Sequence, residues 1–250
     1  SDNIVIWYYS LDTHVQAYTM LDVVYDDIMF FKECGVRGLF VEAETKGLGL
    51  QYVMTDIIYK MNWNPDMTEE EFDVTLDSIL EQDFGEGWAY IREYLDGTLN
   101  KAQDIADQCW NCWGYMTLNA IGQYDNAFIA EQFDNSVWLL EKAAGMALNA
   151  RQQRNAELLM VHMLYEGCFS SYFKAYDEGD TARISVLNER YNRMVKVLDT
   201  YGPSTSDLNW AHVSIHRTLE ESAWLDWADW RDELPKGETQ RPAPEKYADA

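Results

Sequence analysis

The sequence predicts a mainly α-helical protein that begins with a strand–helix–strand unit. Two runs, residues 3–9 and 36–42, are apolar or aromatic at nearly every position, which is typical of strands buried on both faces of a parallel sheet. Between them, apolar side chains recur with a helical period over residues 21–33, and Gly35 follows as a helix stop signal. Beyond the second run, the sequence shows only helical patterns.

Helical periodicity accounts for most of the remaining chain. A capping box opens one helix, because the Thr68 hydroxyl can accept a hydrogen bond from the Glu71 amide while the Glu71 carboxylate reaches back. This helix is expected to stop near Gly85. The other predicted helices cover residues 48–61, 88–109, 136–148, 156–176, 182–198 and 211–230.

Charge and hydropathy exclude several classes of function. The 250 residues include 43 acidic and 19 basic side chains, for a net charge of −24. A field of this sign repels phosphate, so we expect neither nucleic acid nor an anionic membrane surface as a partner. The chain has no apolar run long enough to predict a membrane span and no signal peptide. It also lacks a P-loop, a GxGxxG sequence before a helix and a GxSxG elbow, which argues against nucleotide enzymes and serine hydrolases.

The cysteine and histidine patterns predict no metal centre and no cofactor. Cys109 and Cys112 have the spacing of a zinc-ligand pair, but no second pair accompanies them. His212 and His216 lie one helical turn apart, yet Val213 stands where a zincin motif requires Glu. We interpret the cysteines as buried free thiols and the two histidines as structural.

Two parallel strands alone do not make a stable sheet, since their outer edges and one face need partners. No later segment of the sequence predicts the missing strands. The simplest interpretation is that residues 1–60 are the end of a larger α/β domain whose earlier strands lie outside this chain.

Five segments carry a resemblance to a known family. In order they are residues 7–10 (WYYS), 30–42, 63–66 (WNPD), 83–86 (DFGE) and 91–94 (IREY). The series resembles a bacterial domain-of-unknown-function family of polysaccharide-utilisation proteins (DUF4838), which is related to α-glucuronidase-like glycoside hydrolases. The resemblance covers about residues 3–100. It implies that the two strands are the last two of a (β/α)₈ TIM barrel, and it favours an extracellular or periplasmic location.

This interpretation divides the chain into three parts. Residues 1–62 are expected to hold the last two strands and helices of an incomplete barrel, and residues 63–234 an α-helical C-terminal domain. Residues 235–250, with three prolines and mixed charges, are expected to be a tail or linker. The expected partners are an oligo- or polysaccharide and the missing N-terminal barrel segment of the same protein.

The second strand supplies the candidate catalytic residues, Glu42 and Glu44. Alternation puts Phe40 and Glu42 on one face, with Glu44 if the strand continues, while Leu39 and Val41 face the helices. Barrel enzymes place their active sites at the carboxyl ends of the strands, and glycoside hydrolysis needs two carboxyl groups. Glu42 and Glu44 are therefore predicted to act as acid/base groups or to bind sugar hydroxyls. Alternatively, one of them is a solvated loop carboxylate.

The first strand supplies candidate substrate-binding residues at the same rim. Trp7 and Tyr9 can stack on the apolar faces of sugar rings, although packing in the barrel core explains them as well. His14, just beyond, can contact a ligand or simply lie in solvent.

Two functions from different classes remain open. The first is the C-terminal part of a glycoside-hydrolase-like protein that degrades or binds polysaccharide. The second is a non-catalytic helical module for carbohydrate binding or protein interaction. Trp224, Trp227 and Trp230 repeat every three residues, which favours a packing stripe on a helix or, alternatively, a stacking platform for a polysaccharide.

Overall fold

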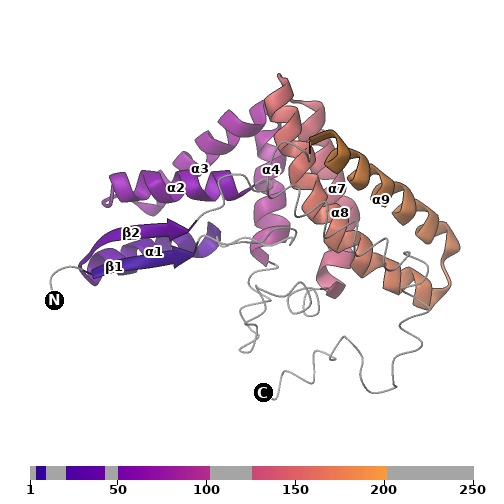
Figure 1. Cartoon of the computed structure of the whole chain (residues 1–250), viewed down its shortest axis with the longest axis horizontal. Helices are drawn as coiled ribbons and strands as arrows, with labels where there is room; N and C mark the ends of the chain where they lie inside the picture. Colours follow the sequence, from indigo (N-terminus) through magenta and orange to yellow (C-terminus); the bar gives the residue numbers. More distant parts are fainter. Residues whose placement is uncertain (1–3, 10–20, 43–49, 102–125, 202–250) are drawn as a thin grey trace, which may run out of the picture.

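The computed structural model describes residues 4–9, 21–42, 50–101 and 126–201, and within them the protein is mainly helical (Figure 1). A small sheet and its covering helices lie at one end of the molecule, and three long helices lie at the other. The elements are β1 (Ile4–Tyr9), α1 (Leu21–Glu33), β2 (Val36–Glu42), α2 (Leu50–Trp63), α3 (Glu69–Phe84), α4 (Trp88–Tyr94), α7 (Asn126–Gly145), α8 (Ala150–Glu178) and α9 (Thr181–Tyr201). The predicted helix over residues 211–230 and the predicted tail lie outside the described residues.

The predicted strand–helix–strand unit is confirmed. β1 and β2 pair in parallel, with α1 as the connection between them, and the register is regular from Val5 onward. α1 and α2 both contact β2. Leu39 and Val41 pack against the core beneath these helices, while Phe40 lies on the opposite face, so the predicted alternation along β2 is also confirmed.

Burial of the sheet on both faces, which the apolar strands predict, is not present among the described residues. Val5 is 64% exposed, Trp7 60% and Phe40 58%. The physical reason is that the covering helices pack against one face only, and no described strand extends the two-stranded sheet. The described part of the sheet therefore has an uncovered apolar face, which we call the open sheet face (Val5, Trp7 and Phe40).

α3 begins at the predicted capping box. The Glu71 amide donates to Thr68 Oγ1 over 3.2 Å, and the Thr68 amide donates to Glu71 Oε2 over 2.8 Å. The helix ends at Gly85, whose φ of 64° is a left-handed conformation that glycine adopts without a steric penalty. Both ends of α3 are therefore set by the signals that the sequence contains.

The segment after α3 departs from the single helix predicted over residues 88–109. α4 ends at Tyr94 and continues as a π-helical turn, Leu95–Leu99, before residues 100 and 101 return to α-helix. The apolar face is nevertheless as predicted, because Ile91, Tyr94, Leu95 and Leu99 are all buried. Residues 102–109 lie outside the described residues.

α7, α8 and α9 form the opposite end of the molecule and pack closely on one another (Figure 1). The Phe133 ring of α7 lies directly against Gly167 of α8, so close that even a methyl group at Gly167 would clash with it. One hydrophobic cluster extends from Tyr8 in β1 to Leu198 in α9 and joins the two ends of the described structure. The domain boundary expected at residues 62/63 stays a prediction.

Candidate functional site

The carboxyl ends of the two strands bring two predicted site residues together. Tyr9 and Glu42 are register partners at the last pair of the parallel ladder, so their backbones are neighbours at one edge of the sheet. The chain folds this way locally because α1 carries the backbone from the end of β1 back to the start of β2. This edge is where parallel α/β structures place their ligands.

Trp7 lies two residues before this edge. It pairs with Phe40 across the ladder, and the two rings make an edge-to-face contact with centroids 5.5 Å apart. Both rings belong to the open sheet face. The neighbouring Tyr8 points to the other face, where its hydroxyl donates to Asp27 Oδ2 over 2.8 Å.

The other predicted site residues cannot be placed beside these. Glu44 and His14 lie outside the described residues, as do Cys109, Cys112, His212 and His216. The predicted Trp224, Trp227 and Trp230 stripe lies there too. Their predicted roles stay predictions.

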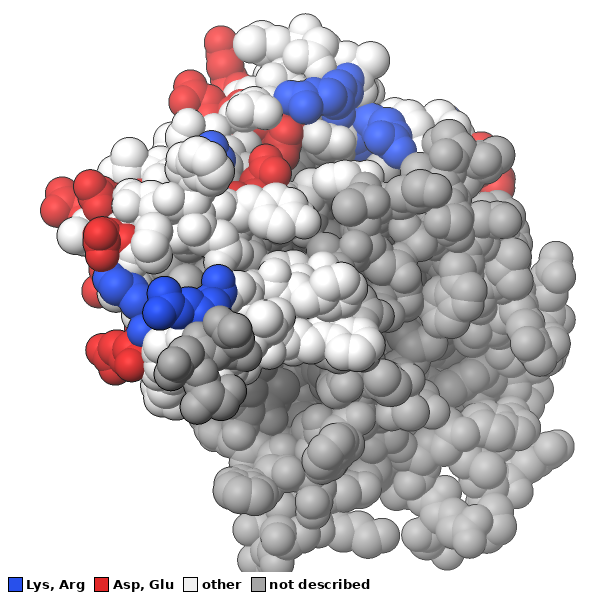
Figure 2. Space-filling model, turned by 60° about the vertical axis from the view of Figure 1, so that its left-hand side comes forward, with Lys and Arg blue, Asp and Glu red and all other residues white. Residues whose placement is uncertain are grey.

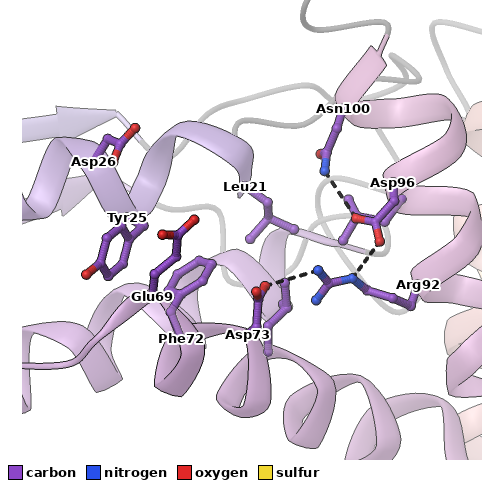
Figure 3. Close-up of a pocket in the computed structure, with 11 residues that line it drawn as sticks. Leu21, Tyr25, Asp26, Glu69, Phe72, Asp73, Arg92, Asp96 and Asn100 are labelled. Atoms are coloured by element: carbon purple, nitrogen blue, oxygen red, sulfur yellow. Dashed lines mark hydrogen bonds and ion pairs between the residues drawn. The ribbon is translucent and has the colours of Figure 1, made fainter.

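A second candidate site, a pocket of about 160 Å³, was not predicted from the sequence (Figure 3). It lies between α1, α3 and the π-helical turn that follows α4. Its floor is apolar and its walls are acidic, with Arg92 and Asn100 on one side. The lining residues are Leu21, Tyr25, Asp26, Glu69, Phe72, Asp73, Leu76, Arg92, Leu95, Asp96 and Asn100.

Arg92 is the centre of an ion-pair network at this pocket. Its guanidinium donates to Asp96 Oδ2 over 2.8 Å and to Asp77 Oδ1 and Asp73 Oδ1 over 3.1 Å each. Burial acts to lower the pKa of Arg92, but the hydrogen bonds to Asp96 and Asp73 outweigh it and raise that pKa. The single positive charge of Arg92 is thus shared by three carboxylates, and the network links α3 to α4. Because these carboxylates surround it, the guanidinium is not available to an anionic ligand.

This pocket was missed because its residues come from separate elements. The only local signal is the i,i+4 spacing of Arg92 and Asp96, which is common on helix surfaces. The acidic run at residues 69–71 is explained by the first turn of α3, where negative charge is favourable. The π-helical turn that carries Asp96 has no sequence signature that periodicity alone could reveal.

The described part of the chain holds no cluster of metal-ligating side chains, and its two free cysteines differ in exposure. Across residues 4–9, 21–42, 50–101 and 126–201 there is no group of three metal-ligating side chains. Cys168 is buried, and burial raises the pKa of its thiol to about 12, so it stays protonated and unreactive. Cys34 is an exposed free thiol, which corrects the prediction that all the cysteines are buried.

Several basic side chains of the described ranges form ion pairs. Lys32 pairs with Asp66 over 2.7 Å, and Arg151 pairs with Asp83 over 3.4 Å. On the face drawn in Figure 2, the basic side chains form small groups, and acidic side chains lie directly beside the group at the lower left. Among the described residues on this face there is no continuous basic stripe of the kind that follows a phosphate backbone.

Comparisons with known proteins leave the chain without an assigned family. No family model matches the sequence, no curated protein matches it, and no solved structure matches the fold. Among the described helices, none combines the length and apolarity that crossing a membrane requires.

Proposed function

We propose that β1 and β2 are the last two strands of a glycosidase-like (β/α)₈ barrel, and that their carboxyl ends form part of a carbohydrate site. The observation that carries this proposal is the pairing of Tyr9 with Glu42 at one sheet edge, two residues from the exposed ring of Trp7. An acid beside aromatic side chains suits a sugar, which offers hydroxyl groups and apolar ring faces to the same site.

The open sheet face supports the barrel part of the proposal. In a barrel, helices cover the outer face of the sheet and side chains from the other strands fill its interior. In β1 and β2 helices cover one face, with Leu39 and Val41 beneath them, and Phe40 lies on the face that would point inward in a barrel. Further strands would bury Phe40, and burial of such a side chain contributes roughly 1.5–3 kcal/mol to the free energy of unfolding. The expected partner at this face is therefore the missing barrel segment of the same protein.

In the proposed site, Glu42 acts as one of the two carboxyl groups of glycoside hydrolysis or binds a sugar hydroxyl. A retaining mechanism places the two carboxyl groups about 5–5.5 Å apart and an inverting one about 6.5–9.5 Å. Glu44 or an acid on another strand supplies the second group. Trp7 and Tyr9 hold the sugar by stacking, which fixes the glycosidic oxygen relative to the acids.

The test uses the protein expressed from its whole gene and a panel of neutral polysaccharides and oligosaccharides. Glu42→Gln keeps the shape of the side chain and removes its charge, and we expect release of reducing sugar to fall at least tenfold. Glu33→Gln, at the end of α1, is the matched control and is expected to leave turnover unchanged. Equal activity of Glu42→Gln and the unmodified protein would remove Glu42 from the site.

A second candidate function is a non-catalytic, helical carbohydrate-binding module. The observation that favours it is the close packing of α7, α8 and α9, which buries apolar side chains on all three helices without help from the sheet. The same panel separates the two functions. Binding of glycan with no release of sugar would favour the module and would count against the glycosidase.

A further inference from the structure

α2 carries three exposed aromatic side chains along one line. Tyr52, Tyr59 and Trp63 are 41%, 54% and 92% exposed. They stand at positions i, i+7 and i+11, and at about 100° per residue these positions fall on one narrow face of the helix. We call this face the α2 aromatic stripe (Tyr52, Tyr59 and Trp63).

The stripe lies on the side of α2 that faces away from the buried core. Val53, Ile57 and Met61, on the opposite side of α2, are fully buried against the core. Further strands beside β2 would bring their helices against the flanks of α2, since helices of a barrel lie side by side around the sheet. The stripe therefore stays exposed even if the proposed barrel is complete.

We propose that the α2 aromatic stripe binds an extended, neutral polysaccharide by stacking. This inference rests on the proposed function, because it takes carbohydrate as the ligand class. At about 1.5 Å of rise per residue, the successive ring positions are roughly 10.5 Å and 6 Å apart along the helix. These separations match the advance of two sugars and of one sugar in a chain of β-linked pyranoses.

The chemistry of the stripe favours this ligand over an apolar protein surface. The three large side chains of the stripe are all aromatic, and each ring can cover the C–H face of one sugar. Asp56 lies between Tyr52 and Tyr59 on the same face and is exposed, so it can accept hydrogen bonds from hydroxyl groups.

Charge complementarity sets the kind of polysaccharide. The carboxylate of Asp56 lies within the stripe, and the whole chain has a net charge of −24. An anionic glycan, an anionic membrane or a second copy of this acidic chain would be repelled on approach. A neutral polymer meets no such barrier, and it offers Asp56 hydroxyl donors.

The experiment measures adsorption of the whole-gene protein to microcrystalline cellulose and to insoluble linear β-mannan. The Tyr59→Ala/Trp63→Ala double variant is expected to lower the bound fraction at least fivefold on the polymer that binds best. Trp138→Ala on α7 is the control, because Trp138 is an exposed tryptophan (47%) that lies outside the stripe. Its bound fraction is expected to stay within twofold of the unmodified protein. Circular dichroism melting of each variant verifies the fold.

Three outcomes would overturn the inference. These are adsorption of the double variant equal to that of the unmodified protein, adsorption of the unmodified protein to neither polymer, and a dimer in light scattering that the double variant abolishes. The last outcome would assign the stripe to a second copy of the chain.

Failure of this inference can be distinguished from failure of the proposed function. Glu42→Gln is expected to adsorb normally and to lose hydrolysis, while the double variant keeps hydrolysis of short soluble oligosaccharides and loses adsorption. Adsorption that depends on the stripe, without any hydrolysis, would leave the inference standing and overturn the glycosidase. Hydrolysis together with adsorption that the double variant does not reduce would overturn the inference and leave the glycosidase proposal standing.

Discussion

The two ends of the molecule differ in how completely their apolar side chains are covered. At the helical end, Phe133, Leu159 and Leu187 are buried, and ion pairs lie outside them. At the sheet end, Trp7 and Phe40 are exposed although they lie in the middle of their strands. The core of the helical end is thus covered by its own helices together with α3 and α4, whereas the sheet end has the surface of an interface.

The difference has a structural cause in the type of element. Three antiparallel helices can turn their apolar stripes toward one shared axis, and α3 and α4 cover what remains of α8 and α7. A parallel sheet has two faces and two edges, and one connection such as α1 covers only one face. Further contacts are therefore needed at the open sheet face and not at the helical core.

The largest effect is expected for Phe133→Ala at the helical end. Phe133 is fully buried, and the guanidinium of Arg190 lies 4.8 Å from the centre of its ring. Loss of a buried phenylalanine costs about 3–5 kcal/mol in the free energy of unfolding, because a cavity replaces the ring. Urea denaturation followed by circular dichroism measures this change.

Phe30→Ala is the control for this prediction. Phe30 is an exposed phenylalanine on α1, so its truncation is expected to cost less than about 1 kcal/mol. Equal losses for the two variants would mean that the helical end is no better packed than the surface of α1.

A smaller effect is expected at the open sheet face. Trp7→Ala removes the edge-to-face contact with Phe40, and such a pair contributes about 0.5–1.5 kcal/mol. Since most of the Trp7 side chain is already in water, the 250-residue chain is expected to lose no more than this. The same substitution in the protein expressed from its whole gene gives a second measurement. If a barrel covers Trp7 there, the loss in the free energy of unfolding would rise to about 3–5 kcal/mol. A loss of that size in the 250-residue chain alone would contradict the exposed state of Trp7.

The ends of elements were predictable where a local chemical signal marks them. β2, α1 and the start of α3 lie at the predicted residues, because Gly35 and the Thr68 capping box act within a few residues. α7 begins ten residues before the predicted Ser136, and α8 begins six before the predicted Ala156. The first turns of α8 are rich in Arg and Gln and hold few apolar side chains, so apolar periodicity is weak there although the backbone is helical.

The candidate site was predictable only where one strand pair forms it. Tyr9 and Glu42 were placed together by the rule that parallel strands share their carboxyl edge. The pocket at Arg92 combines Tyr25, Asp73 and Asn100 from three elements, and the sequence alone does not say which helix faces which. The α2 aromatic stripe is periodic in the sequence, but only its exposure separates it from a core stripe.

The smallest effect concerns the ion pairs that close the helical end. Asp134 of α7 accepts hydrogen bonds from Arg183, over 3.1 Å, and from Arg190, both on α9. Partial burial acts to raise the pKa of Asp134, but the hydrogen bonds from Arg190 and Arg183 outweigh it and lower that pKa below 3.8. Because the folded-state pKa is the lower one, the stabilisation is fully present above pH 3.8 and is lost as the pH falls through the folded-state value. Asp134 is more than half exposed, so the contribution is expected to be under about 1 kcal/mol.

Asp134→Asn is therefore expected to be less stable than the unmodified protein at neutral pH and equal to it in strong acid. The measurement is urea denaturation of both proteins across this pH range, with Glu189→Gln, an exposed carboxylate on α9, as the control. A stability difference that grows as the pH falls would contradict the lowered pKa of Asp134. A difference that disappears in acid would show that ion pairs between α7 and α9 add a small part of the stability of the helical end. These ion pairs lie far from the open sheet face (Figure 1). Since Trp7 and Phe40 carry no charge, the loss at the sheet end should be the same at every pH.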